Sequence, residues 1–495
     1  MHANDPVLRF RGSVASGPAN TALEVAGQVI SYIELDRLSD AFANAVTDAG
    51  HGGKRVAFTA RRDGPWSYAA FLGLLKAGCA AVPLLPEGPL HRWNMMLQGA
   101  DVQVMLAHPD PDPLELELRS ARTGTVWLEP AADGAITTGV DVMVGPEAEA
   151  YIMFTSGSTG VPKGVAVSRG NLAAYIGSFL DRFKVTSSDR CSQHFALAFD
   201  LSMHDLFITW SAGACLCVPA DSGGLRAASW VRREAIDVWF SVPSLAAVMR
   251  RGRMLIPKTM PSLRLAFFCG EALPWDLVDA FRSAAPHARV VNLYGPTEAT
   301  IAITYHEVGG SFGMRGTVPI GRPLGSDRVV ILDEDGRSAE EGELLLSGPQ
   351  VTKGYLNAPD AMARAFVRLP DDDVLWYRTG DLVKQDVDGV LHFQGRADHQ
   401  VKVLGHRIEP GEVDDALRSR LEGGNAVTVP ISMSGVLRLI TFVDVPVDVP
   451  GLLEHLRTVL PSAWIPERIV VMDALPRTAS GKWDRGQLKQ WFEHE

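Results

Sequence analysis

The chain has 495 residues, a formal net charge of −11, 46% hydrophobic residues and 21% charged residues. This composition is typical of a folded globular protein and excludes a disordered, collagen-like or coiled-coil chain. The acidic balance argues against nucleic acid as a main partner, because binding a phosphate backbone requires a basic surface. No stretch approaches the roughly 18 uninterrupted apolar residues of a membrane span, so we expect no membrane insertion.

The N-terminus and the cysteines indicate the compartment. The first residues show no basic segment followed by an apolar one, so we expect no signal peptide. The five cysteines are scattered and include no C-x-x-C pair. This pattern predicts a cytoplasmic protein without disulfides or a zinc site.

The N-terminal part of the chain alternates between helical and strand patterns. Ser31 and Glu34 have the spacing of a capping box and precede apolar residues at helical spacing. Residues 55–58 and 80–84 are typical of short buried strands, and residues 68–76 between them are typical of a helix. Single helices between strands predict parallel β-α-β units.

The same rhythm continues and then changes. Residues 151–154 are a predicted strand, followed by a glycine-rich loop and a helix from Arg169, and residues 238–241 and 265–268 are further predicted strands. After about residue 319 the strands are short and separated by aspartate-glycine turns, which indicates an antiparallel sheet.

Residues 155–164, Thr-Ser-Gly-Ser-Thr-Gly-Val-Pro-Lys-Gly, are the strongest local motif and directly follow a predicted strand. The glycines let a ligand approach the backbone, the hydroxyls supply donors and Lys163 supplies a positive charge, which is the chemistry of a phosphate-binding loop. It is not a Walker A motif, because two residues separate Gly160 from Lys163. The alternative is a flexible loop of small residues.

Four more motifs follow in the chain. Residues 292–298 offer an aromatic ring for a base and a carboxylate for Mg²⁺. Residues 377–381 place a carboxylate after a predicted turn, where it suits ribose hydroxyls. Residues 395–402 contain a cation next to an expected domain boundary, and residues 476–482 put a lysine in a loop. An ordinary turn, loop or solvated charge explains each motif alone.

Together and in this order, these motifs resemble those of the adenylate-forming (AMP-binding) superfamily, which includes amino-acid adenylation domains, acyl- and aryl-CoA ligases and luciferases. The resemblance extends over essentially the whole chain. It implies an α/β fold with a large N-terminal domain, residues 1–395, built from parallel α/β sheets and a small antiparallel subdomain. A small, mobile α+β C-terminal domain would cover residues 396–495.

The resemblance also implies an activity. In this family a substrate carboxylate attacks the α-phosphate of ATP, pyrophosphate leaves, the C-terminal domain rotates and a thiol captures the acyl group. ATP and Mg²⁺ are therefore the expected cofactors, with Glu298 as the metal ligand. The residues that the resemblance assigns to ATP or AMP are Thr155, Ser156, Gly157, Ser158, Thr159, Gly160, Lys163, Gly270, Glu271, Ala272, Asn292, Tyr294, Gly295, Thr297, Asp381, Arg396 and Lys482.

Within that set, Thr155, Lys163 and Lys482 are the expected catalytic residues. Lys482 would bridge the substrate carboxylate and the α-phosphate, where a cation stabilises the charge that develops in the transition state. Asp398 occupies the position of the family's hinge. Gly405 would line the thiol tunnel, because glycine lets a slender arm pass close to the backbone. Leu404 departs from the family pattern, since many relatives carry a basic residue there.

The acyl pocket indicates the substrate. In relatives that activate amino acids, the Asp after the Phe of the Phe199–Phe207 string pairs with the α-ammonium group, and Asp200 is that residue here. A buried carboxylate is costly unless a cation pairs with it, so Asp200 favours an amino acid over a fatty or aryl acid; the alternative is an N-cap residue. The pocket residues that the resemblance assigns are Asp200, Leu201, His204, Ser241, Phe267, Cys269, Leu293, Ile301 and Ala302.

These residues predict a small neutral amino acid. Residues 268–274 and 199–202 resemble D-alanine–carrier protein ligases, so alanine is the first choice, with serine, glycine and proline behind it. His204 is interpreted as a pocket wall, and a base or a metal ligand is the alternative.

The sequence therefore predicts an AMP-forming ligase in nonribosomal peptide synthesis or antibiotic biosynthesis. It would load the phosphopantetheine thiol of a separate carrier protein. An acyl- or aryl-CoA ligase and a degenerate nucleotide-binding protein are the alternatives.

Overall fold

The computed structural model describes residues 4–130, 139, 142–156, 161–220, 224, 226–310, 313–370, 372–398, 400–418, 420–421, 423–433, 436–478 and 483–494. Residues 157–160 of the predicted phosphate loop and the predicted catalytic Lys482 lie outside these ranges. Each helix in the described part is too short or too polar to cross a membrane.

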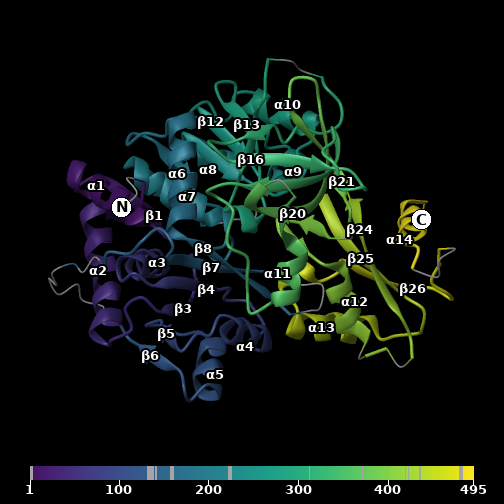
Figure 1. Ribbon diagram of the computed structural model, residues 1–495, viewed down its shortest axis with the longest axis horizontal. Coiled ribbons are helices and arrows are strands. Elements are labelled where there is room, and N and C mark those ends of the chain that lie inside the picture. The colour runs from purple at the N-terminus through teal and green to yellow at the C-terminus, as the bar shows by residue number, and fades with distance from the viewer. Residues whose placement is uncertain are drawn as a thin grey trace.

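Two large sheets form the N-terminal part of the chain (Figure 1). The first has seven strands in the order β18-β8-β7-β4-β3-β5-β6. Its strands are β3 (Arg55–Thr59), β4 (Ala80–Leu84), β5 (Val104–Leu106), β6 (Val126–Leu128), β7 (Glu149–Thr155), β8 (Lys163–Ser168) and β18 (Tyr355–Leu356). The pairs among β3 to β7 are parallel, as expected from the β-α-β rhythm, while β8 is antiparallel to β7.

The second sheet has nine strands in the order β15-β14-β13-β12-β11-β9-β10-β1-β2, and the six from β13 to β1 pair in parallel. Its strands are β1 (Thr21–Val25), β2 (Gln28–Ser31), β9 (Arg190–Ser192), β10 (Cys215–Cys217), β11 (Val238–Ser241), β12 (Leu265–Phe268), β13 (Arg289–Tyr294), β14 (Thr304–Glu307) and β15 (Arg322–Pro323). The helices of these two layers are α1 (Pro6–Ser16), α2 (Tyr32–Asp48), α3 (Trp66–Lys76), α4 (Leu90–Gly99), α5 (Pro113–Ala121), α6 (Arg169–Phe183), α7 (Leu201–Ala212), α8 (Ala227–Arg233), α9 (Pro243–Arg251) and α10 (Trp275–Ala284).

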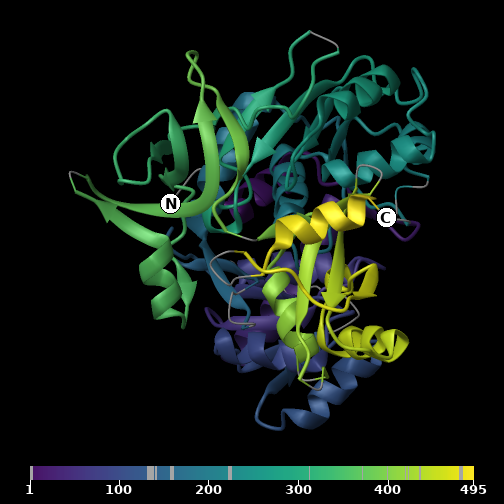
Figure 2. The same ribbon diagram turned by 90° about the vertical axis from the view of Figure 1, so that its right-hand side faces the viewer.

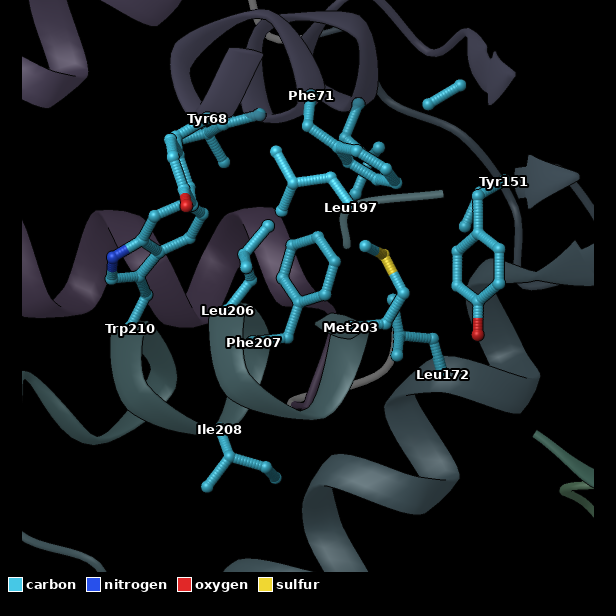
Figure 3. Packing of buried hydrophobic residues seen from close by; sticks show 14 of the residues in the cluster. Tyr68, Phe71, Tyr151, Leu172, Leu197, Met203, Leu206, Phe207, Ile208 and Trp210 are labelled. Carbon is cyan, nitrogen blue, oxygen red and sulfur yellow. The ribbon is translucent and has the colours of Figure 1, made fainter. Parts of the chain in front are cut away.

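Helices α3 and α7 are apolar on nearly all sides because they are buried inside this core. In Figure 3, Phe207 of α7 points toward Phe71 of α3, and their ring centroids are 5.9 Å apart. Ile208 points to the opposite side of α7 (Figure 3). The hydrophobic cluster around α7 also includes Phe267 and Leu293, so the same packing holds the wall of the site.

An antiparallel sheet and the C-terminal elements complete the chain (Figures 1 and 2). The sheet consists of β16 (Arg328–Leu332), β17 (Glu341–Ser347), β19 (Phe366–Leu369), β20 (Asp372–Gln385) and β21 (Leu391–Arg396), with α11 (Pro359–Ala365) beside it. The C-terminal elements are the hairpin β22 (Val401–Val403) and β23 (His406–Ile408), α12 (Pro410–Arg418), β24 (Ala426–Met433), β25 (Val436–Val443), α13 (Val449–Val459), β26 (Arg468–Val471) and α14 (Arg485–His494).

The α/β fold class, with parallel sheets, a small antiparallel subdomain and a smaller C-terminal region, is confirmed. The division at residues 395 and 396 stays a prediction. Two strands overlap residues that the sequence indicated as a loop or a turn. β8 (Lys163–Ser168) begins inside the predicted loop of residues 155–164, and Asp381 lies inside the long strand β20 rather than after a turn. Gly380 has a positive φ of 72°, which allows an irregular step within that strand. The sequence around this glycine therefore looks like a turn although it lies inside a strand.

A buried ion-pair network joins α2 to α3. Lys76 Nζ lies 2.7 Å from Asp36 Oδ1 and 2.7 Å from Asp40 Oδ1, and its side chain is 0% exposed. Arg11 pairs with the same two carboxylates. Because these charged groups are buried, the cost of removing each from water is offset only by the opposite charges beside it.

We predict that Lys76→Met lowers the free energy of unfolding by about 3–5 kcal/mol, since the two buried carboxylates lose their fully buried partner and keep only Arg11, whose side chain is 25% exposed. Chemical denaturation of the full chain, followed by tryptophan fluorescence, measures the change. Lys353→Met is the matched control, because its pair with Glu147 is on the surface and the Lys353 side chain is 79% exposed. Equal stability of the two variants would contradict the prediction.

Candidate active site

Two cavities lie where the C-terminal hairpin meets the N-terminal sheets. They have volumes of about 150 Å³ and 790 Å³ and share Gly270, Asp381, Arg396 and Lys402 in their walls. Several lining residues follow the carboxyl ends of parallel strands, which is where ligands bind in α/β sheets. Ser156 follows β7, Gly270 follows β12 and Gly295 follows β13.

The larger cavity has a wall that fits an adenine. Tyr294, Gly270, Glu271, Ala272 and Asn292 all line it, so the structure brings the predicted adenine residues together. Asn292 donates its amide hydrogens to the carbonyl oxygens of Val318 and Pro319, at 3.3 and 2.9 Å. Its Oδ1 is buried and has no hydrogen-bond partner among the described residues. An unpaired acceptor at this position matches the exocyclic amino group of adenine.

Asp381 stands between the two cavities and is fixed by its neighbours. Arg396 Nη1 donates to Asp381 Oδ1 at 2.6 Å, and the Tyr294 hydroxyl donates to Oδ2. Asp381 and Arg396 are also cross-strand partners on β20 and β21. Arg396 in turn pairs with Asp398, the predicted hinge residue, at 2.6 Å. The carboxylate is therefore held in one position, as hydrogen bonding to ribose hydroxyls would require.

The phosphate side of the site is positively charged. Thr155 and Lys163 are cross-strand partners at the end of the β7–β8 hairpin. Lys163 Nζ lies 5.4 Å from the centroid of the Tyr355 ring, and burial, followed by the nearby charge of Arg407, lowers its pKa. The Ser156 hydroxyl is buried without a partner among the described residues. Both features suit an anion, although Gly157, Ser158, Thr159 and Gly160 lie outside the described residues.

Glu298, the predicted metal ligand, is buried beside these cations. It lies in the 3₁₀ turn η1 (Thr297–Ala299), and its side chain is 0% exposed. Tyr355 donates a hydrogen bond to it, and Arg407 Nη1 lies 3.3 Å from Oε1. Although burial acts to raise its pKa, Arg407 and the Tyr355 hydroxyl keep the pKa of Glu298 below its ordinary value. The carboxylate is thus ionised, and an ionised oxygen donor next to a phosphate site fits Mg²⁺.

Asp200 is the buried carboxylate of the smaller cavity. It occupies the N-cap position of α7, but its side chain makes no capping hydrogen bond within the described structure. Burial raises its pKa to about 6, opposed by a hydrogen bond from Thr297 and by the charge of Lys402. Because the N-cap alternative fails, Asp200 is free to pair with a cation that enters the cavity.

Six of the nine predicted pocket residues lie in one hydrophobic cluster, and the exceptions are Asp200, His204 and Ser241. Leu201, Phe267, Cys269, Leu293, Ile301 and Ala302 are all members of it. His204 is buried next to it and makes a 2.6 Å hydrogen bond between Nδ1 and the Tyr175 hydroxyl. Burial lowers the pKa of His204 to about 3, so the buried imidazole is neutral at physiological pH.

Ser241 is the third exception, and its hydroxyl is engaged by neighbouring residues of its own chain segment. Its hydroxyl accepts a hydrogen bond from Trp239 Nε1 at 2.9 Å and donates one to the carbonyl oxygen of Val242 at 3.1 Å. Successive residues of a strand point to opposite faces, so Phe240 packs on the other side of β11 from Ser241. The ring centroids of Phe240 and His204 are 4.3 Å apart, and Phe240 belongs to the pocket cluster.

Sequence reasoning missed the support beneath the pocket. Thr300 and Ile301 have φ values of 54° and 74°, which is a strained conformation for β-branched residues. The Gln350 side-chain amide donates to the carbonyl oxygens of Ala299, Thr300 and Ala302, at 3.4, 3.4 and 2.8 Å. Gln350 therefore holds the strained loop, and no motif in the sequence marks it.

The C-terminal hairpin, residues 401–408, enters the site. The Gly405 N–H donates to Glu271 Oε1 at 2.8 Å, and Gly405 has a φ of 81°. Lys402 Nζ lies 5.8 Å from the centroid of the Tyr294 ring. Lys402 and Arg407 were not predicted as site residues, although they stand three and two positions from Gly405.

Several known proteins are similar in sequence to this chain over most of its length. A family model described as AMP-binding enzyme matches residues 10–356. The chain is 31% identical to the L-proline–[L-prolyl-carrier protein] ligase of Pseudomonas fluorescens, with 98% of this chain and 99% of that protein covered. It is also 31% identical to the D-alanine–D-alanyl carrier protein ligase of Lactiplantibacillus plantarum, with coverages of 94% and 95%.

A solved structure and two longer proteins extend the comparison. The adenylation domain AlmE of Vibrio cholerae, in complex with glycyl-adenosine-5′-phosphate, has a TM-score of 0.87 and 32% identity over 99% of this chain and 98% of that one. The chain spans 6% and 20% of the length of two nonribosomal peptide synthetases that it also matches, from Salinispora arenicola and Bacillus subtilis. With most of its length matched by the family model and near-complete relatives at 31% identity, the chain belongs to the AMP-binding enzyme family of adenylate-forming ligases.

Proposed function

We propose that this enzyme joins a small neutral amino acid to AMP, with release of pyrophosphate, and then transfers it to the phosphopantetheine thiol of a carrier protein. One observation carries the proposal: the buried, uncapped carboxylate of Asp200 lines a cavity that shares walls with the nucleotide cavity. A carboxylate there is costly without a cation, and the α-ammonium group of an amino acid supplies one. A fatty or aryl acid has no such group.

The pocket walls support a small side chain. Beyond Asp200, the proposed walls are Phe240 and Phe267 of the hydrophobic cluster and the neutral His204 next to it, and none of these would pair with a charged side chain. Phe179 packs edge-on against His204 at 4.6 Å and tilted against Phe267 at 4.9 Å, and we propose that these rings limit the size of the substrate side chain. Alanine is our first choice, and glycine is the nearest competitor.

The names of three similar proteins support a small amino acid as the substrate. Two are named as ligases of proline and of D-alanine, and the third was solved with a glycyl adenylate. The names of the first two also support a carrier protein as the acceptor. The acceptor and the alanine preference remain proposals for this chain.

The other predicted site residues would have separate roles in the reaction. Lys482 would stabilise the charge that develops on the α-phosphate, while Lys163 and Thr155 would hold the departing phosphates. Asn292 and Tyr294 would orient the adenine, and Asp381 would orient the ribose. Mg²⁺, held by Glu298, would neutralise the charge of the phosphates during the reaction.

Amino-acid-dependent exchange of pyrophosphate into ATP tests the proposal. A panel of the twenty amino acids, D-alanine and several aryl acids is assayed with the full chain and Mg²⁺. We expect exchange with alanine or glycine above all others. Exchange with an aryl acid alone would favour the acyl- or aryl-CoA ligase, and exchange with no substrate would overturn the proposed reaction.

We predict that Asp200→Ala raises the KM for the amino acid by the equivalent of about 3–5 kcal/mol, because it removes one member of a buried ion pair. The KM for ATP should change little, since Asp200 lies in the smaller cavity with the substrate. Steady-state pyrophosphate exchange measures both constants.

The pH profile is the control for this assignment. Asp200 has a pKa raised to about 6, so its carboxylate is ionised above that pH and is protonated as the pH falls through it. The kcat/KM for the amino acid should therefore fall below about pH 6 in the native enzyme, and Asp200→Asn should lose this fall. An identical fall in both proteins would show that another group is responsible.

We predict that Lys482→Ala abolishes pyrophosphate exchange while the affinity for ATP changes little. The reason is that a cation acting in the transition state contributes several kcal/mol to rate and little to ground-state binding. Transfer of the acyl group from a preformed aminoacyl-adenylate to the thiol should survive. Failure of that isolated second step would show that Lys482 acts in both half-reactions.

We predict that Cys269→Ala widens the pocket and admits larger or opposite-handed side chains, at a loss of about 1–3 kcal/mol of discrimination per methylene-sized change. Burial raises the pKa of Cys269 to about 12, so the group is a thiol and not a nucleophilic thiolate. The ratio of kcat/KM for alanine and 2-aminobutyrate measures the change. An unchanged ratio would remove Cys269 from the pocket, and complete loss of adenylation would indicate nucleophilic catalysis.

A further inference from the structure

Glu24, Cys215 and Cys217 lie together as a group of possible metal ligands. Their ligand atoms all lie within 4.8 Å of one another, and the two sulfur atoms are 3.6 Å apart. We expected no zinc site from the sequence, because the cysteines include no C-x-x-C pair. In a strand, however, residues i and i+2 point to the same face, so a C-x-C pair can present two sulfurs to one ion.

Three neighbouring strands of the nine-stranded sheet bring this group together. Cys217 on β10 is the register partner of Glu24 on β1, and Cys215 is the register partner of Arg190 on β9. The two cysteines belong to one hydrophobic cluster and Leu216 between them belongs to another, as expected when both thiols share one face of the sheet. An ion held by these side chains would therefore join β1 to β10.

The spacing of the two sulfurs fits a tetrahedral ion. Zn²⁺ binds thiolate sulfur at about 2.3 Å, which places two sulfurs of a tetrahedral site about 3.8 Å apart. The distance of 3.6 Å between the thiols is close to this value, so only small side-chain adjustments are needed. Thiolate and carboxylate are both ligands that Zn²⁺ takes in proteins, and water can fill the fourth position.

Arg190 supports the group from the neighbouring strand. Its Nη1 and Nη2 donate to the two carboxylate oxygens of Glu24, at 2.9 and 2.6 Å, and Nη1 lies 3.9 Å from Cys215 Sγ. A carboxylate has about four lone-pair sites, so these two hydrogen bonds leave others for a metal. Two thiolates and one carboxylate around a divalent cation carry one excess negative charge, which the guanidinium neutralises. Hydrogen-bonded partners of this kind orient metal-binding carboxylates.

We propose that Glu24, Cys215 and Cys217 bind a Zn²⁺-class ion, with Arg190 as the positioning residue that orients Glu24. As the sulfur–metal bonds form, the two S–H bonds break and their protons pass to solvent. Glu24 provides an entry path, because its side chain is 26% exposed, whereas Cys215 and Cys217 are 7% and 1% exposed.

This site is separate from the catalytic one. Glu24, Arg190, Cys215 and Cys217 are absent from the described walls of both active-site cavities. The ion would therefore be structural, holding β1 against β10, and distinct from the Mg²⁺ proposed at Glu298. The inference goes beyond the proposed function and does not depend on it.

Titration of Cd²⁺ into the full chain, treated with a chelator and kept reduced, tests the site. Cd²⁺ bound by thiolates gives an ultraviolet charge-transfer band, which an all-oxygen site such as Glu298 does not give. We expect one tightly bound Cd²⁺ per chain, a band with the intensity of two thiolates, and its loss when Zn²⁺ is added in excess. Cys79→Ser is the matched control and should leave the band unchanged, since this buried thiol contacts the carbonyl oxygens of His51 and Ala77 instead.

Four variants separate the roles of the residues. Cys215→Ser and Cys217→Ser should each lose at least half of the band, and the double variant should lose all of it. Glu24→Gln should weaken Cd²⁺ binding by at least about 10-fold, and Arg190→Gln by about 10–100-fold, the usual loss when a partner of a metal ligand is removed. In both of these variants the band at saturation should keep its intensity, because both thiolates still bind. A merely disturbed fold would lose it.

A measurement on the native chain does not depend on the folding of any variant. X-ray absorption at the zinc edge of the chain loaded with one equivalent of Zn²⁺ should show two sulfur neighbours at about 2.3 Å together with lighter neighbours.

Three results would overturn the inference. The first is a native chain that shows no thiolate band with Cd²⁺ and no sulfur neighbours around Zn²⁺. The second is a band that persists in the double cysteine variant, which would place the ion elsewhere. The third is an unchanged Cd²⁺ affinity in Glu24→Gln, which would exclude the carboxylate as a ligand. Amino-acid-dependent pyrophosphate exchange is measured separately, so this claim and the proposed function fail separately.

Discussion

The fit of Gly405 against the N-terminal core is the contact on which the rest of the site depends. A Cβ atom on this residue would lie 2.6 Å from Val242 Cγ1, and its φ of 81° favours glycine. Its N–H also satisfies the buried carboxylate of Glu271. A larger residue would collide with Val242 at this position. The glycine therefore lets the C-terminal hairpin reach the carboxyl ends of strands that are more than a hundred residues away in sequence.

Docking of that hairpin explains the distribution of charge in the site. It adds Lys402 near Tyr294 and Arg407 beside Glu298, so the nucleotide side becomes strongly positive. Asp200 sits on the other side, in an apolar wall, with its charge only partly compensated. The site is therefore divided into a cationic region that suits phosphates and an apolar pocket with one carboxylate that suits an ammonium group. This division is what an enzyme that joins an amino acid to a nucleotide requires.

The sequence predicted best where the determining contacts are local. The capping box of Ser31 and Glu34 is present, because both partners lie within one helical turn. Ser241 stays a predicted pocket residue, although its neighbour Phe240 is the one in the hydrophobic cluster, because a strand alternates faces and a motif does not show which face is buried. The pair of Arg407 and Glu298 spans 109 positions and carries no pattern along the chain. Gln350 was missed for the same reason, since it acts through backbone carbonyl groups on a distant loop.

The most direct measurement is mass spectrometry of the product bound after a single turnover. The full chain is incubated with ATP, Mg²⁺ and an equimolar mixture of the amino acids and aryl acids, and the bound nucleotide is released by denaturation. Pairing of the substrate ammonium group with Asp200 predicts alanyl- or glycyl-adenylate as the dominant species. An adenylate of an acid without an amino group would contradict it, and so would an adenylate of a large or charged amino acid.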